Sequence, residues 1–149
     1  MMKPFLISMI CLISAFTKAS AQQTSEQGTR KAEKKFFLNH EITRNIDFEV
    51  YLNHKVVTKS RETDHMPGPY ELNPHLVPGS KQRIKIKLMP APGAKTIRPQ
   101  TIENINKNIG IYLLENRDYD HIKTVKLLKF PVITKNTAEY TYEWTFLLN

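Results

Sequence analysis

Alternation of apolar and polar residues predicts most of the elements of this chain. Apolar Phe48, Val50 and Leu52 alternate with Glu49 and Tyr51, which is the two-residue period of a strand with one buried face. Further extended segments of this kind are predicted over residues 56–58, 84–88, 108–115, 121–130 and 138–148. Strands are therefore expected along most of the chain after residue 47.

Proline, glycine and polar clusters separate these segments and indicate the fold class. Residues 61–69 are expected to form a loop, residues 78–80 a turn, and Pro90 and Pro92 end the strand that follows that turn. Helical periodicity is weak, and residues 101–108 are expected to form one short helical turn at most. Short strands between turns predict an all-β fold, an antiparallel β-sandwich of jelly-roll or immunoglobulin-like type.

The N-terminus has the pattern of an export signal. Lys3 precedes an apolar run over residues 5–16, and the small residues Ala19 and Ala21 follow it. This order predicts a secretory signal peptide over residues 1–21, and the apolar run is too short to cross a bilayer. The protein is therefore expected to be exported, to the periplasm or the extracellular space, with a retained membrane anchor as the alternative.

The single cysteine and the polar segment after the signal complete the predicted domain plan. Cys11 lies inside the apolar run, and bulky Ile10 before it disfavours the alternative of lipid attachment. The mature chain then has no cysteine, so its core must hold it together without a disulfide. Residues 22–35 are predicted to be a polar flexible tether, and residues 36–149 one β-sandwich domain with no transmembrane segment.

Charge narrows the class of partner. Lysine and arginine number 22 against 14 acidic residues, for a formal net charge of +8. An excess of this sign favours an anionic partner: an acidic protein, an anionic glycan or the outer face of a negatively charged membrane. Nucleic acid is not expected, because an exported protein rarely meets it.

A row of basic residues is the candidate binding site. Lys81, Arg83, Lys85 and Lys87 alternate with the residues of a predicted buried face. Three interpretations remain open. The row binds an anionic partner, or acids of equal phase on a neighbouring strand, such as Asp47 and Glu49, compensate it. Alternatively, its lysines deter pairing at a sheet edge.

Motifs for catalysis or cofactor binding are missing from the sequence. It has no Gly-x-Ser-x-Gly elbow, no glycine-rich phosphate loop and no His-Glu-x-x-His, so we expect no enzyme and no cofactor. Asn116, Asp118 and Asp120 are read as a polar turn, because a calcium loop needs a glycine and a glutamate that are not in place. The five histidines are read as separate turn and surface residues and not as a metal site: His40, His54, His65, His75 and His121.

The last predicted strand carries an aromatic row on one face. Tyr140, Tyr142, Trp144 and Phe146 alternate with polar residues. Rings at this spacing belong to the core of a domain without disulfides, or they form a platform on which sugar rings stack.

Part of the chain resembles a known family. In this comparison, residues 52–55 correspond to an Asn-Gly turn of the family, residues 72–79 correspond to a second segment, and residues 84–88 correspond to the long strand that follows it. This pattern resembles the galactose-binding-like jelly-roll domains attached to many glycoside hydrolases. The mature chain is also similar to small uncharacterised secreted proteins of Bacteroidota-type bacteria. The resemblance implies a jelly-roll fold and raises the expectation of glycan binding.

These observations together predict an exported, non-catalytic binding or accessory protein. Its expected partner is a protein with an acidic surface, and a carbohydrate-binding module is the alternative.

Overall fold

The computed structural model describes residues 33–42, 45–114 and 122–148. Most of the predicted tether, the whole predicted signal peptide and the predicted polar turn at residues 116–120 lie outside this part. The described residues belong to one compact unit, Lys31–Asn149. Among them, no helix is long and apolar enough to pass through a bilayer.

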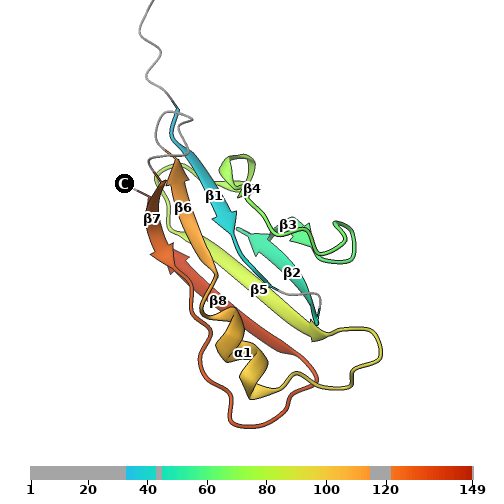
Figure 1. Cartoon of the computed structure of the whole chain (residues 1–149). Coiled ribbons are helices and arrows are strands. Elements are labelled where there is room, and N and C mark those ends of the chain that lie inside the picture. Colours follow the sequence, from blue (N-terminus) through green and yellow to red (C-terminus); the bar gives the residue numbers. More distant parts are fainter. Residues whose placement is uncertain (1–32, 43–44, 115–121, 149) are drawn as a thin grey trace, which may run out of the picture. The chain divides into compact units, whose positions relative to one another are not determined.

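In the described part of the chain, eight strands form two antiparallel four-stranded sheets, so the predicted all-β sandwich is confirmed (Figure 1). The first sheet has the order β4-β1-β6-β7, and the second has the order β3-β2-β5-β8. The bounds of the strands are β1 Lys35–Asn39, β2 Ile46–Leu52, β3 Lys55–Lys59, β4 Tyr70–Glu71, β5 Gln82–Pro90, β6 Gly110–Leu114, β7 Ile122–Leu127 and β8 Tyr140–Phe146. Among the described strands, only β2–β3 and β6–β7 are hairpins between consecutive strands, and every other connection passes from one sheet to the other.

The two-residue period survives in the core. Ile84, Ile86 and Leu88 of β5 are fully buried, and they face the interior together with Phe48 and Val50 of β2. In the first sheet, the core residues come from the same alternation on two neighbouring strands: Phe36, Leu38, Ile111 and Leu113. Strand β5 ends at Pro90, as expected from a residue that cannot donate to a ladder.

The helix is longer than the sequence suggested. Residues 101–108 were expected to give one turn at most, but α1 spans Pro99–Ile105 and buries Ile102 and Ile105. Pro99 occupies the start of the helix, where its missing N–H costs nothing. Asn106, at the end of α1, exchanges two hydrogen bonds with the backbone of Phe130 and so ties the helix to the chain after β7.

Side-chain amides fix the turn and the loop that lead into β5. Asn53 and His54 join β2 to β3 with positive φ angles of 50° and 69°, a conformation that asparagine tolerates better than most residues. The Asn53 amide donates to the backbone oxygen of His75 and to Oε1 of Gln82. Buried Gln82 in turn donates to the backbone oxygens of Val77 and Ser80. These bonds set the start, and therefore the direction, of the basic strand β5.

Candidate functional site

The basic row lies on the outer face of the second sheet. Arg83, Lys85 and Lys87 alternate with the buried residues of β5, and Lys81 directly precedes that strand. Strand β5 runs between β2 and β8, so the row lies in the interior of the sheet (Figure 1). An explanation of these lysines as edge protection therefore does not apply to β5.

Two acidic residues contact two of the four basic side chains. Glu143 belongs to β8, and Glu139 directly precedes that strand. Arg83 Nε lies 3.1 Å from Oε1 of Glu143, and Lys87 Nζ lies 2.7 Å from Oε2 of Glu139. The hydrogen bond that Lys87 donates to Glu139 raises the pKa of Lys87. All four side chains are partly exposed, so solvent screens both pairs and they add little to stability.

The acidic residue Glu49 of strand β2 does not neutralise the basic row in the way that the compensation interpretation supposes. Glu49 is the direct cross-strand neighbour of Lys87, the placement that the compensation interpretation requires, but its Oε2 accepts a 2.5 Å hydrogen bond from Tyr51. This bond raises the pKa of Tyr51. Lys85 lies over the Tyr51 ring, with its Nζ 4.4 Å from the centroid, in a cation–π contact.

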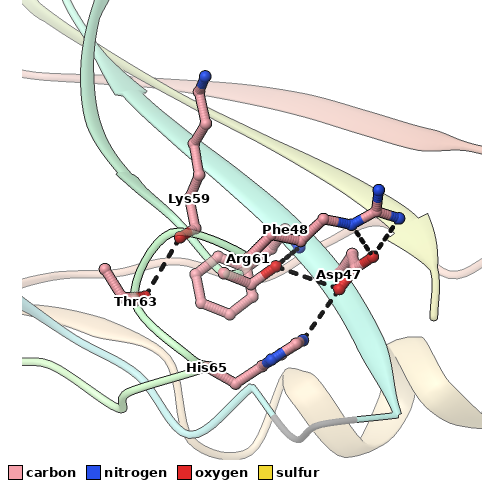
Figure 2. Close-up of polar contacts among 7 residues, drawn as sticks. Asp47, Phe48, Lys59, Arg61, Thr63 and His65 are labelled. Atoms are coloured by element: carbon pink, nitrogen blue, oxygen red, sulfur yellow. Dashed lines mark hydrogen bonds and ion pairs between the residues drawn. The ribbon is translucent and has the colours of Figure 1, made fainter. Parts of the chain in front are cut away.

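The predicted pairing of Asp47 with the basic row is wrong. Asp47 lies opposite Met89 of β5 and is fully buried, because the chain after β3 folds over it. Figure 2 shows Arg61 and His65 converging on its carboxylate. The carboxylates that form ion pairs with the basic row are therefore those of Glu139 and Glu143, and they reach two of its four side chains.

The carboxylate of Asp47 is bound at both oxygens. Oδ2 accepts a hydrogen bond from Nε of Arg61 at 2.6 Å, and Arg61 Nη2 lies 2.6 Å from the same oxygen. Oδ1 lies 2.9 Å from Nε2 of His65 and accepts a longer bond, 3.3 Å, from the Ser60 hydroxyl (Figure 2). Ser60 Oγ also accepts the N–H of Phe48. These contacts hold the segment after β3 against β2.

The Asp47 cluster contains a serine, a histidine and an aspartate, but in an arrangement that serves packing. A nucleophilic serine needs a histidine in hydrogen-bond contact with its hydroxyl. Here Ser60 and His65 each contact the aspartate, and Ser60 is only 1% exposed. A buried hydroxyl that already bonds to backbone and carboxylate is a structural group.

His40 corrects the expectation that the histidines are turn and surface residues. Its ring is fully buried, meets Phe48 edge-on at 4.7 Å between centroids and stacks on Tyr70 at 5.5 Å. Nδ1 accepts the N–H of Ile42, and Nε2 has no partner in the described structure. Burial lowers the pKa of His40 to about 4.

The other described histidines come from three different segments. His54 is in the β2–β3 turn, His75 is in the 3₁₀ turn at Asn73–His75, and His65 contacts Asp47. His121 lies outside the described residues. Within the described ranges, no three histidine, cysteine or acidic side chains converge as metal ligands.

The aromatic row of β8 divides between core and surface. Trp144 and Phe146 are buried, as the core interpretation predicts, whereas Tyr142 is 38% exposed and Tyr140 is half-buried. Trp144 packs edge-on against Phe130 and donates from Nε1 to the backbone oxygen of Lys129. A continuous four-ring platform is therefore not present on this strand.

Comparison with known proteins gave no match to a family model, to a curated protein or to a solved structure. The resemblance to galactose-binding-like domains and to secreted Bacteroidota-type proteins thus stays a prediction, and the function must be argued from the geometry of the chain itself.

Proposed function

We propose that the protein is an exported, non-catalytic binding or accessory protein that recognises the acidic surface of a partner protein through the basic row. The observation that carries this proposal is the placement of Arg83, Lys85 and Lys87 on one face of an interior strand. A strand paired on both sides has a fixed backbone, so its basic side chains extend from fixed positions and no backbone has to be ordered when a partner binds.

The polar groups elsewhere in the fold support assigning recognition to this face. The Asp47 cluster and the amides of Asn53 and Gln82 bond to other parts of the same chain. Lys81 has no ion pair within the described residues, and Lys85 contacts a ring and not a carboxylate. Basic side chains in that situation are available to an external anion.

The proposal is tested by reversing the charge of the row. We expect the variant Arg83→Glu/Lys85→Glu/Lys87→Glu to lose at least about tenfold in affinity for immobilised poly-L-glutamate at low ionic strength, because attraction becomes repulsion. The measurement is surface plasmon resonance on variants whose circular dichroism matches the parent.

A matched control separates local recognition from bulk charge. Lys95→Glu/Arg98→Glu/Lys107→Glu reverses three exposed basic residues around α1 and changes the net charge by the same amount. Equal loss in both variants would reduce the effect to net charge and contradict the proposed site. A sugar-dependent rise in melting temperature that Tyr142→Ala abolishes would instead favour the carbohydrate-binding alternative.

A further inference from the structure

Two side chains of the basic row already hold carboxylates. Glu143 binds Arg83 from β8, and Glu139 binds Lys87 from the residue before β8. Both acids lie on the surface beside the row, so the structure itself shows where a carboxylate sits when it contacts these two basic groups.

Glu139 and Glu143 form ion pairs with only two of the four basic side chains of the row. Lys85 is the cross-strand neighbour of Glu143, but Glu143 turns to Arg83, and Lys85 Nζ lies over the Tyr51 ring. Lys81 has no ion pair in the described part of the chain. An external acid can therefore gain contacts at Lys81 and Lys85 that no internal acid provides.

The spacing of the row limits the form of the partner. Arg83, Lys85 and Lys87 are separated by two residues each along β5. A strand rises about 3.3–3.4 Å per residue, so the basic groups recur at roughly 6.7 Å. An acidic polypeptide in an extended conformation, with carboxylates at alternate residues, has the same repeat.

We propose that Glu139 and Glu143 are internal stand-ins for the partner's carboxylates, and that an extended acidic segment of the partner displaces them and lies along β5. This inference rests on the proposed function. Displacement is inexpensive because exposed ion pairs are weak, and the gain comes from Lys81 and Lys85. In the free protein, the two glutamates then compete with the partner and lower its affinity.

The competition predicts a gain of binding, which loss of folding cannot imitate. The probe is an octapeptide in which glutamate and threonine alternate. We expect Glu139→Gln/Glu143→Gln to bind it about three- to tenfold more tightly than the parent at low ionic strength, by isothermal titration calorimetry.

The control removes two exposed acids elsewhere in the fold. Glu71→Gln/Glu103→Gln changes one acid of β4 and one of α1 and alters the net charge equally. We expect less than about a twofold gain from it, since neither acid contacts the row. We also expect the alternating peptide to bind more tightly than an isomer with its four glutamates in one block.

The outcomes separate this inference from the proposed function. If Arg83→Gln/Lys85→Gln/Lys87→Gln loses the peptide while the Glu139/Glu143 variant gains no more than the control, the proposed function stands and the displacement mechanism is wrong. If the triple glutamine variant binds as the parent does, both fail. If the Glu139/Glu143 variant gains more for a heparin oligosaccharide than for the peptide, the ligand class is wrong.

Discussion

At the scale of single residues, His40 makes the stability of the fold depend on pH. Its ring is fully buried, and burial lowers its pKa from 6.5 to about 4. The unfolded chain therefore binds a proton between these values while the folded chain does not. Stability that is present above pH 6.5 is lost as the pH falls toward 4, by on the order of 3 kcal/mol at most from this group.

We expect His40→Phe to reduce this acid sensitivity. Phenylalanine keeps a ring beside Phe48 and Tyr70 and cannot titrate, although it leaves the Ile42 N–H without its acceptor and so lowers stability near neutral pH by about 1–3 kcal/mol. Urea unfolding at pH 7.5 and pH 4.5 should show a smaller difference in the free energy of unfolding than in the parent.

The control for His40 is His54→Asn, in an exposed turn, which should keep the full difference between the two pH values. If His40→Phe also keeps the full difference, His40 is not the source of the acid sensitivity.

At the scale of elements, the Asp47 cluster fastens the segment after β3 to β2. We expect Asp47→Asn to cost about 1–3 kcal/mol, because the amide keeps one acceptor oxygen for the three side chains that contact the carboxylate and places an N–H donor against one of them. Amide hydrogen exchange of residues 60–66 should rise in particular, since their hold on β2 is lost. Unchanged protection there would show that the backbone bonds suffice.

The control for the Asp47 prediction is Glu49→Gln. Glu49 has the same outward phase two residues along β2, but it is half-exposed and contacts Tyr51. This variant should leave exchange in residues 60–66 as in the parent, because its carboxylate makes no bond to that segment.

The contrast between Asp47 and Glu49 also shows how much of the fold could be predicted from the sequence. Alternation predicted the strands because each sheet buries only one face, and it placed Arg83, Lys85 and Lys87 together on the other. Alternation does not say which chain segment covers an outward residue, so Asp47 and Glu49 look equivalent in the sequence. Only the fold of the segment after β3 buries one and leaves the other on the surface.

Strand neighbours and short elements escaped prediction for a related reason. The acids that reach the row come from β8 and the residue before it, and a two-residue period carries no information about which strands pair. β4 has two residues and α1 has seven, too few for a period to show. His40 follows a short strand, and its burial depends on Phe48 and Tyr70 from elsewhere in the chain.

At the scale of the whole molecule, Trp144 joins β8 to the chain after β7. It is 8% exposed, packs against Phe130 and bonds to the backbone of Lys129. We expect Trp144→Ala to cost about 3–5 kcal/mol, measured by chemical denaturation. Tyr142→Ala, which removes a ring that is 38% exposed, should cost clearly less. A Trp144→Ala variant about as stable as the parent would contradict the structural role assigned to this ring.

The passage of the chain back and forth between the sheets has a consequence for folding. Apart from the hairpins β2–β3 and β6–β7, every strand pairing joins segments that are distant in the sequence, and β5 is paired on both sides only when β8 is in place. Such contacts close large loops, so they form late and folding is slow. If residues 1–21 direct export, slow closure leaves the newly made chain extended for longer, which is the state in which a polypeptide can be threaded through a membrane.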